Sequence, residues 1–584
     1  MSADTSLERL ADSILIPPFA GTTAPGWLLD ALYRGLAGVT LFAPNMAAGP
    51  EALGELTRTL RAAAPDLLVA ADEEGGDVTR VWYDTGSPYP GNAALGAIDD
   101  AALTELVHAA IGTDLARLGI NLDLAPCLDV LAAPGNPVVG TRSFGADPAL
   151  VARHGAAAVR GLQSAGVAAC AKHFPGHGAT LLDSHVELAI VPDGLATVQE
   201  RDLPPFRAAV AAGVLTVMPG HLRLADLTGE LPASLSAAAI ALLRSALGFD
   251  GVVVSDALEM RAVSDVFGIP GAAVRAVAAG NDLLCLGRDV PEEGYLAVRA
   301  ALRDAVRSGE LPAARLEEAA AQAGGLRARL ARLRTATSTG GAGDREGAAS
   351  TADAVGAMGT AGAAGPAAGQ PAGPVWDPGG VGLVAARRAL RVTGARPDLR
   401  DPVVIEVEPL PNMAAGSARW GLAGYAPADG SRRVAAAPDP VQAAAAALKA
   451  AAGRSLVLVV RDAHRSPATR HLVTAILAER PDTVLVEMGL PYWQPPAGSC
   501  QTYLVTFGAS QANSRAAAEF LGLTAERLKR QALRKRAFSE TVDSRSRAAL
   551  RRRKPRWARG DGASSASSLP PSSRLPVGYS ASRR

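Results

Sequence analysis

The sequence predicts an α/β protein, with an N-terminal (β/α)8 barrel of the TIM type, a smaller α/β sandwich domain and a disordered basic tail. Three observations support this prediction. Up to about residue 290 the chain contains eight short apolar runs, each followed by a segment with helical spacing. A Gly/Ala/Pro-rich stretch then interrupts the pattern, and strand-like runs return after it. The end of the chain is strongly basic.

The eight apolar runs have the length and composition of parallel strands that are buried on both faces. Each run is short and largely apolar, and the roughly 20 to 50 residues between runs leave room for a helix. The runs are Ser13 to Pro18, Gly38 to Ala43, Leu67 to Ala71, Ile120 to Ala125, Val167 to Ala171, Val214 to Met218, Gly251 to Val254 and Asp282 to Leu286. Their number and spacing match a (β/α)8 barrel. A doubly wound open sheet is the alternative, but the first strand-helix junction lacks its usual glycine fingerprint.

The remaining chain divides into further segments. Arg315 to Arg334 is expected to close the barrel domain, residues 1–334, as an amphipathic helix. Residues 335–380 have hardly an aliphatic anchor, which indicates a flexible linker. In residues 381–523 the strand-like runs return, which indicates a second α/β domain with a mostly parallel sheet. Its polar set, interpreted as a solvated strand end, consists of Arg461, Asp462, His464 and Arg465.

The net charge of +1 conceals an acidic body and a basic tail. From Ala525 onward there are 17 Lys/Arg against 4 Asp/Glu, so this segment carries +13 and residues 1–524 carry −12. The segment 524–584 is expected to be disordered. Basic clusters can bind nucleic acid, but these lack aromatic interleaving beyond Trp557. We therefore expect no nucleic-acid partner and interpret the tail as a dispensable extension.

The composition favours a cytoplasmic protein with no membrane association. The N-terminus has no basic region followed by a long apolar stretch, and no later segment reaches membrane-spanning length without charge. The cysteines are scattered singly, as buried small hydrophobic residues would be, rather than paired as a disulfide framework or a zinc site. They are Cys127, Cys170, Cys285 and Cys500.

Charged side chains follow the predicted strands, on the side where a barrel forms its active site. The residues just past the strands include Asp72, Glu73, Glu74, Asp129, Lys172, His173, His221 and Asp256. Strands can end in polar residues merely because they emerge into solvent. That explanation would not account for so many Asp and His residues and so few Ser, Asn and Thr.

The loop AKHFPGHGATLLDSHVE, residues 171–187, concentrates reactive side chains. It holds three of the eight histidines together with a lysine and an aspartate, and its glycines and proline break any regular period. Four of its side chains could bind zinc or manganese: His173, His177, Asp183 and His185. Nothing, however, pairs the loop with the His-x-His that metal-dependent barrels often carry on an early strand.

Asp256 lies at the end of the seventh run, in GVVVSDALEM. A carboxylate held there among apolar neighbours is a nucleophile, a metal ligand or a helix N-cap. The helix-like sequence Ala257 to Val266 adds weight to the cap without excluding the other two, since a cap aspartate directly precedes its helix.

Taken together, KHFPGHG, the following DSH and GVVVSDALEM resemble glycoside hydrolase family 3, specifically its β-N-acetylhexosaminidase branch. The resemblance extends in the family's order through DEEGGDVTR (72–80), INLDLAPCLDV (120–130) and GNPVVGTRSFG (135–145). It therefore covers the whole predicted barrel. It implies a (β/α)8 first domain and retaining hydrolysis of β-linked N-acetylglucosamine, with neither a cofactor nor a metal.

The resemblance also implies roles for individual residues. Asp256 would be the nucleophile that forms a covalent glycosyl-enzyme. His185 would be the general acid/base, with Asp183 holding and polarising its imidazole. Four residues would bind the sugar: Asp72, Arg142, Lys172 and His173. His177 and Glu187 are expected to shape the loop rather than touch the substrate.

Two residues depart from the family's DQEGGR, because Glu73 replaces the glutamine and Asp77 the arginine. We expect these departures to affect specificity rather than activity. Phosphorolysis stays open, since a neutral histidine does not repel phosphate as a carboxylate would. A β-glucosidase of the same family, a metal-dependent barrel hydrolase and an inactive sugar-binding protein are further alternatives. The expected partner is an oligosaccharide, either a muropeptide or a chito-oligosaccharide fragment, and the resemblance points to cell-wall recycling.

Overall fold

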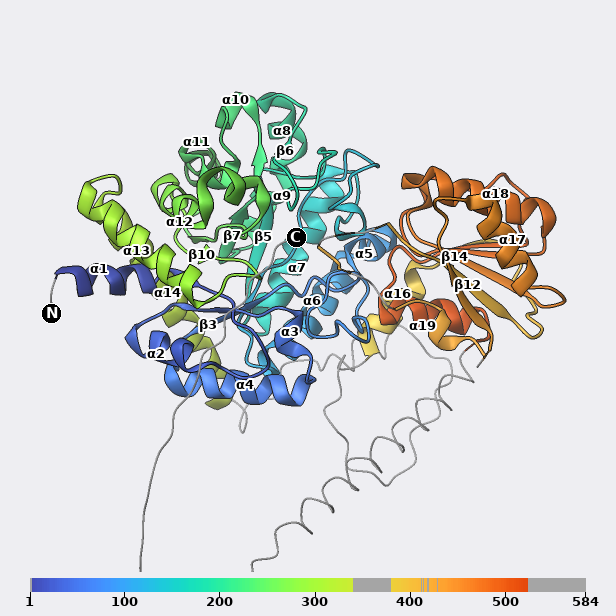
Figure 1. Ribbon diagram of the computed structural model, residues 1–584, viewed down its shortest axis with the longest axis horizontal. Coiled ribbons are helices and arrows are strands. Elements are labelled where there is room, and N and C mark those ends of the chain that lie inside the picture. Colours follow the sequence, from blue (N-terminus) through green and yellow to red (C-terminus); the bar gives the residue numbers. More distant parts are fainter. Residues whose placement is uncertain are drawn as a thin grey trace, which may run out of the picture. The chain divides into compact units, whose positions relative to one another are not determined.

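The computed structural model describes residues 3–339 and 380–523, apart from 411, 413, 417–419 and 428. All of these belong to one compact unit, in which a barrel precedes a second α/β sheet (Figure 1). Residues 340–379 of the predicted linker and the whole predicted tail, 524–584, lie outside the described residues.

The first sheet system is a ring of short strands. The strands are β1 (Leu15–Ile16), β2 (Gly38–Thr40), β3 (Leu68–Ala71), β4 (Leu122–Asp123), β5 (Ala168–Phe174), β7 (Thr216–Pro219), β9 (Val252–Val253) and β10 (Leu284–Cys285). Six of them form a parallel sheet in the order β2-β3-β4-β5-β7-β9, and β1 pairs in parallel with β10. A parallel bridge between Val254 and Leu283 joins β9 to β10. The N–H of Thr40 donates to the carbonyl of Pro17 at 3.1 Å and closes the ring between β1 and β2.

Each ring strand coincides with one of the eight predicted apolar runs, so the predicted barrel is confirmed. Helices surround the strands (Figure 1). They are α1 (Ala3–Asp12), α2 (Gly26–Arg34), α3 (Ala43–Met46), α4 (Pro50–Ala63), α5 (Asn92–Ile98), α6 (Ala101–Arg117), α7 (Pro148–Ser164), α8 (Leu195–Arg201), α9 (Leu203–Ala211), α10 (Ala225–Thr228), α11 (Ala237–Ala241), α12 (Arg261–Ala279), α13 (Glu292–Ser308) and α14 (Ala313–Thr339). A small pair, β6 (Ala189–Ile190) and β8 (Leu222–Arg223), lies outside the ring order.

Helix α12 is the only helix among the described residues that is long and apolar enough to cross a membrane. It bends at Gly268, whose φ is 63°, and buries Ala272, Ala273 and Val277 completely in the barrel core. These contacts are those of a core helix of the barrel.

The last barrel helix, α14, is longer than the predicted Arg315 to Arg334 and continues to Thr339. It runs unbroken through Gly324 and Gly325, because its apolar side chains recur at helical spacing and anchor it on the barrel. The buried anchors are Leu316, Ala319, Ala323, Leu326 and Leu330.

The second sheet has the order β11-β16-β15-β14-β12-β13, and only β11 is antiparallel to its neighbour. Its strands are β11 (Arg391–Gly394), β12 (Val403–Val407), β13 (Ser431–Val434), β14 (Leu456–Val460), β15 (Val484–Glu487) and β16 (Thr502–Val505). Helices α17 (Pro440–Ala450) and α18 (Pro467–Glu479) cover one face, and α16 (Val381–Ala389) and α19 (Gln511–Phe520) lie on the other (Figure 1). This confirms the predicted α/β sandwich, here called the second domain.

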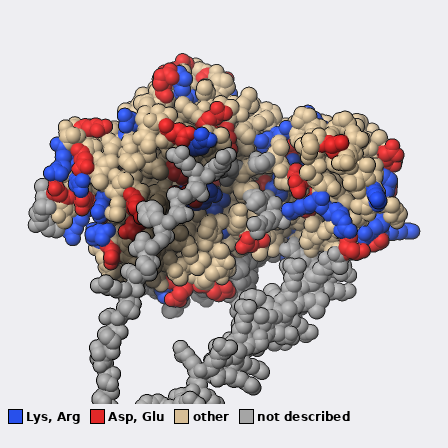
Figure 2. All heavy atoms as spheres, in the orientation of Figure 1, with Lys and Arg blue, Asp and Glu red and all other residues tan. Residues whose placement is uncertain are grey.

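Loops of the second domain pack on the barrel. Leu490 and Phe507, which follow β15 and β16, join a small apolar cluster with Ala93, Cys127 and Val139 of the barrel. Both signs of charge are interspersed over the face of the described residues drawn in Figure 2. The basic clusters of the predicted tail lie outside the described residues.

Candidate active site

A cavity of about 720 Å³ opens where the barrel strands end. The predicted site residues that line it are Asp72, Arg142, Lys172, His173, His185 and Asp256. They come from segments that follow or end β3, β4, β5 and β9, so the barrel brings together residues far apart in sequence. Asp183 does not line the cavity, but its carboxylate contacts His185, which does.

Four charged side chains form a largely buried network on one wall of the cavity. The Lys172 ammonium lies 2.7 Å from Asp72 Oδ1 and 2.7 Å from Glu74 Oε1. Arg142 donates two hydrogen bonds to Glu74, from Nε to Oε2 at 2.9 Å and from Nη2 to Oε1 at 2.8 Å. Such bidentate, charge-assisted contacts fix both partners, so the cationic ends of Lys172 and Arg142 are held at the cavity wall.

These ion pairs keep all four groups charged. Burial alone would raise the pKa of Glu74, but the charges of Arg142 and Lys172 outweigh it and hold that pKa well below its usual value. Burial would likewise lower the pKa of Lys172, yet Asp72 and Glu74 raise it. The pKa of Asp72 is lowered, because the charges of Lys172 and Arg80 overcome the opposing effect of burial.

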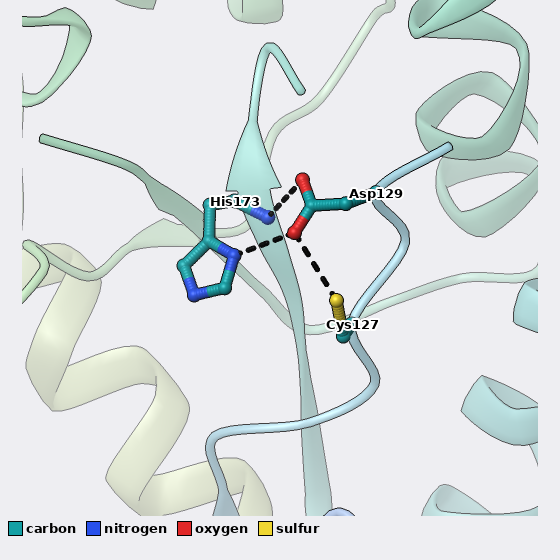
Figure 3. Close-up of side chains that lie close together, drawn as sticks. All are labelled: Cys127, Asp129 and His173. Atoms are coloured by element: carbon teal, nitrogen blue, oxygen red, sulfur yellow. Dashed lines mark hydrogen bonds and ion pairs between the residues drawn. The ribbon is translucent and has the colours of Figure 1, made fainter. Parts of the chain in front are cut away.

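His173 is oriented by Asp129, which is hydrogen-bonded to both its ring and its backbone N–H (Figure 3). Its Nδ1 is 2.7 Å from Asp129 Oδ2, and its Nε2 is 3.4 Å from Arg142 Nη2. If Nδ1 carries the proton, Nε2 is free to accept from Arg142. Asp129 Oδ2 also accepts from the Cys127 thiol at 3.1 Å, and Oδ1 accepts the backbone N–H of His177 at 2.7 Å.

Cys127, Asp129 and His173 are the one group of potential metal ligands that the described residues bring together. Their spacing favours hydrogen bonds. Two ligands about 2.0 Å from a tetrahedral metal stand about 3.3 Å apart, whereas His173 Nδ1 and Asp129 Oδ2 are 2.7 Å apart. Burial also raises the pKa of Cys127 well above its usual value, so this thiol keeps its proton and donates it to Asp129.

Among the described residues, the four metal ligands suggested by the sequence, His173, His177, Asp183 and His185, do not come together as one site. His177 is buried and bonds through its ring to the Thr180 and Ser184 hydroxyls, at 2.7 and 3.1 Å. Asp183 and His185 bind each other. His177 therefore shapes the loop, in agreement with the expectation. Glycine is needed here as well, because a Cβ on Gly178 would stand 1.8 Å from the carbonyl oxygen of Val130.

Asp183 and His185 form a hydrogen-bonded pair on this loop. One oxygen of Asp183, Oδ1, accepts from Nδ1 of His185 at 2.7 Å and from its backbone N–H at 2.9 Å. Burial would raise the pKa of Asp183, but the hydrogen bond and charge of His185 outweigh it and lower that pKa. The imidazole side chain is 28% exposed and lines the cavity, so its Nε2 is the ring atom left to meet a ligand.

Asp256 follows β9 and is not a helix cap. The helix after it begins at Arg261, with Met260 at the N-cap position, so the N-cap interpretation is wrong. Instead, Asp256 Oδ1 accepts the N–H of Ala257 at 2.8 Å. Burial would raise the pKa of Asp256, but nearby His221 and His173 outweigh it and lower that pKa. A buried, ionised carboxylate thus borders the cavity.

Three other polar residues noted in the sequence do not line the cavity: Glu73, Asp77 and His221. His221 is buried, with Nδ1 2.6 Å from the Ser234 hydroxyl and Nε2 2.9 Å from the carbonyl of Ala257. Glu73 is buried, and burial raises its pKa to about 8. Asp77 accepts the N–H of Ala509 of the second domain at 2.9 Å, so one of the two departures noted in the sequence lies at the domain junction.

Several residues of the site could not be assigned a role from the sequence. The sequence did indicate that Glu74 and Asp129 lie near the site, because both are charged residues just past a strand. No pattern in the sequence indicated three other parts of the cavity border, which are Arg80, Glu259 and the Ala414–Gly416 segment. The polar set of the second domain is also more than a solvated strand end, because His464 Nε2 lies 2.9 Å from the Pro134 carbonyl of the barrel.

A model of the glycosyl hydrolase family 3 N-terminal domain matches residues 29–323. Beta-hexosaminidase LpqI of Mycobacterium tuberculosis is 41% identical over 254 residues, which is 42% of this chain and 64% of that protein. A beta-hexosaminidase of Xylella fastidiosa is 39% identical over 279 residues, which is 46% of this chain and 82% of the relative. The present chain thus spans somewhat less than two thirds of the mycobacterial relative.

Solved structures extend the similarity beyond the barrel. A glycoside hydrolase family 3 beta-N-acetylglucosaminidase from a Paenibacillus species superposes with a TM-score of 0.74 at 30% identity. The match covers 89% of this chain and 97% of that structure, so it includes the second domain as well as the barrel.

Proposed function

Because the chain belongs to glycosyl hydrolase family 3, as its motifs predicted, we propose that it is a retaining β-N-acetylhexosaminidase that releases terminal β-linked N-acetylglucosamine from oligosaccharides. The observation that carries the proposal is that Asp256 and the Asp183-paired His185 border one cavity. The names of the bacterial relatives support the activity. Chito-oligosaccharides and muropeptide fragments are the proposed natural substrates.

Asp256 is the nucleophile in this proposal. Its pKa is lowered against the effect of burial, so the carboxylate is anionic at neutral pH. One of its oxygens attacks the anomeric carbon, a C–O bond to the enzyme forms, and the bond from the anomeric carbon to the leaving oxygen breaks. A glycosyl-enzyme with inverted configuration results, and a second inversion in its hydrolysis restores the original configuration.

His185 moves the proton in both steps. Its imidazolium delivers the Nε2 proton to the leaving oxygen as the first bond breaks, and the neutral ring then takes a proton from the water that attacks the glycosyl-enzyme. Asp183 supports this cycle, because its carboxylate fixes Nδ1–H and stabilises the charged ring. An imidazole titrates near neutral pH, where a carboxylic acid would have to be tuned upward.

The charged wall binds the sugar. Asp72 accepts from sugar hydroxyls, while Lys172 and Arg142 donate to hydroxyl oxygens and His173 stands beside them. Because these side chains are held by one another, they lose little rotamer freedom when the sugar binds.

Phosphorolysis is a second candidate, favoured by the nature of the acid/base. The cavity carries the cationic side chains of Lys172, Arg142 and Arg80, and its acid/base is an imidazole. A neutral imidazole does not repel phosphate, so phosphate could replace water in the second step.

The test uses 4-nitrophenyl N-acetyl-β-glucosaminide, with 4-nitrophenyl β-glucoside alongside it and each assay run with and without inorganic phosphate. The proposal expects turnover of the N-acetyl substrate that is independent of phosphate, and a first product of β configuration by NMR. A sugar 1-phosphate would establish phosphorolysis, and a first product of α configuration would overturn retention.

The covalent step is tested separately by intact mass and peptide mapping with a slow 5-fluoro-N-acetylglucosaminyl fluoride. A single sugar adduct on the peptide that contains Asp256 is expected, with Asp256→Asn as the control that forms none. An adduct on another residue would show that Asp256 is not the nucleophile.

A further inference from the structure

The segment 131–139, between β4 and the Arg142 turn, contacts two other parts of the chain. On one side the N–H of Ala133 donates to the carbonyl of Gly178 at 3.0 Å, in the loop that carries Asp183 and His185. This loop, residues 175–187, is called the acid/base loop below. On the other side, Nε2 of His464 in the second domain lies 2.9 Å from the backbone carbonyl oxygen of the segment's proline, Pro134. The segment therefore links the second domain to the acid/base loop.

Asn136 is the residue of this segment that holds the acid/base loop. Its side chain is completely buried. Its Nδ2 donates to the carbonyls of His177 and Thr180, at 2.9 and 3.0 Å. Its Oδ1 accepts the N–H groups of Val138 and Val139, at 2.9 and 2.7 Å. Because the partners are two carbonyls and two N–H groups, only this orientation of the amide satisfies them all.

The two residues that Asn136 holds lead directly to the acid/base. Thr180 Oγ1 lies 2.7 Å from His177 Nδ1, and His177 Nε2 lies 3.1 Å from the Ser184 hydroxyl. Ser184 directly precedes His185, and both line the cavity. The backbone position of His177 and Thr180 therefore determines where this part of the loop stands.

His464 holds the segment from the side of the second domain. The Pro134 carbonyl can only accept, so Nε2 carries the hydrogen and Nδ1 is unprotonated. That Nδ1 is buried and has no hydrogen-bond partner among the described residues. The ring meets Tyr492 edge to face, with the ring centroids 5.3 Å apart. Nearby, Leu131 at the start of the segment packs in one apolar cluster with Leu490 of the second domain.

We propose that Asn136 is a positioning residue for the acid/base, and that the second domain supports it through the contact of His464 with the segment 131–139. This inference rests on the proposed function, in which His185 moves the proton. Proton transfer requires Nε2 of His185 within hydrogen-bond reach of the leaving oxygen, and a misplacement of about 1 Å can cost roughly 100-fold in rate. Neither Asn136 nor His464 lines the cavity, so both act through the loop.

The test compares two substrates that differ in their need for an acid: the β-1,4-linked disaccharide of N-acetylglucosamine and 4-nitrophenyl N-acetyl-β-glucosaminide. In Asn136→Asp the carboxylate can still accept from the N–H groups of Val138 and Val139, but it has no hydrogens for the two loop carbonyls. We expect kcat to fall about 30-fold for the disaccharide and about threefold for the 4-nitrophenyl glycoside, with KM changed less than about threefold. An unfolded fraction would lower both kcat values equally, so their ratio reports positioning.

The contribution of the second domain is measured with His464 variants. His464→Ala should lower kcat for the disaccharide about fivefold and leave the 4-nitrophenyl value within about twofold. His464→Gln should recover most of the loss, because its amide can place an N–H donor near the position of Nε2. The double variant with Asn136→Asp should be no worse than Asn136→Asp alone, since both changes act through the same segment.

Sodium azide provides a second measurement. Azide attacks the anomeric carbon of the glycosyl-enzyme and displaces Asp256 without a general base, so the second step no longer needs His185. In Asn136→Asp it should restore the turnover of the 4-nitrophenyl glycoside to that of the unmodified chain and yield the β-glycosyl azide. Failure of azide to restore turnover would mean that the loss does not lie in proton transfer, and the positioning role would be refuted.

Arg388→Met is the matched control, because it removes another contact between the domains, the 2.8 Å ion pair with Asp100. It should leave the ratio of the two kcat values unchanged. Equal losses for both substrates in Asn136→Asp and His464→Ala, or an equal change of the ratio in Arg388→Met, would overturn the proposal.

The unmodified chain and His185→Ala separate this inference from the proposed function. If the unmodified chain cleaves neither substrate, the proposed function fails and the positioning role with it. If His185→Ala changes the ratio of the two kcat values but Asn136→Asp and His464→Ala do not, only the positioning role fails.

Discussion

Asp183 and His185 are two residues apart on one loop, and a single carboxylate oxygen of Asp183 receives both the Nδ1 and the backbone N–H of His185. The side chain and the main chain of His185 are therefore fixed by the same atom. This leaves Nε2 as the only ring nitrogen that can exchange a proton with a ligand in the cavity.

Replacing His185 should affect turnover according to the leaving group. His185→Ala is expected to lower kcat about 10²- to 10⁴-fold for an oligosaccharide substrate. The loss should be far smaller for 4-nitrophenyl glycoside, whose leaving group needs little protonation. Asp183→Asn should also lower kcat more for the oligosaccharide than for the 4-nitrophenyl glycoside, and each loss should be smaller than that caused by His185→Ala. A loss equal for both substrates would argue against a proton-donating role.

The Asp129 carboxylate should matter for binding more than for turnover. Asp129→Asn loses the anionic acceptor that fixes His173 Nδ1–H, so His173 no longer presents one defined tautomer to Arg142. We expect KM to rise about tenfold with a smaller change in kcat, measured by steady-state kinetics. Cys127→Ser, which retains a donor to Asp129, is the matched control and should leave KM near its original value.

Chelation should leave activity intact. The potential ligands Cys127, Asp129 and His173 are held by hydrogen bonds to one another, and His185 is held by Asp183. Dialysis against EDTA is therefore expected to leave kcat and KM unchanged. Loss of activity that added zinc or manganese restores would instead establish a metal-dependent reaction.

Glu73 should make the folded state less stable as the pH rises. The unfolded chain releases its proton near the usual pKa of 4.5, whereas burial raises the pKa in the folded state to about 8. Between these values the folded state binds more protons, so the free energy of unfolding falls with increasing pH. Its Oε2 accepts from Thr79, Arg80 and Val81, while the buried Oε1 has no hydrogen-bond partner among the described residues.

Glu73→Gln, which restores the family's glutamine, should remove this dependence. The amide oxygen can accept the same three hydrogen bonds, and no proton is needed. The variant should match the original chain near pH 5 and exceed it by on the order of 3 kcal/mol at pH 8, measured by urea unfolding. A difference that does not change with pH would show that Glu73 is not the titrating group.

Local sequence patterns predicted the barrel and most of the site for a physical reason. A strand buried on both faces must be apolar along its length, and the residue after it must leave the core, so Lys172 and Asp256 mark the cavity in the sequence itself. The Ala257 to Val266 helix was placed too early, because apolar spacing does not reveal where the backbone turns before Arg261.

Local sequence patterns could not predict contacts between segments that are far apart in the chain. Arg80 and the Ala414 carbonyl are 334 residues apart, and one of the partners is a backbone atom that no residue type announces. The same holds for Asp77, whose partner is the backbone N–H of Ala509. The sequence showed that Asp77 differs from the family's arginine, but it could not show which group Asp77 contacts.

Asp77 is 8% exposed and accepts the Ala509 N–H at 2.9 Å through one oxygen and the Thr141 hydroxyl at 2.8 Å through the other. Asp77→Arg, which restores the family's arginine, would bury a cation facing two donors. We expect it to lower the free energy of unfolding by about 3 kcal/mol or more. Asp77→Asn keeps one acceptor and should lower it by about 1 kcal/mol. If urea unfolding shows Asp77→Arg to be as stable as the original chain, the carboxylate is not what holds this junction together.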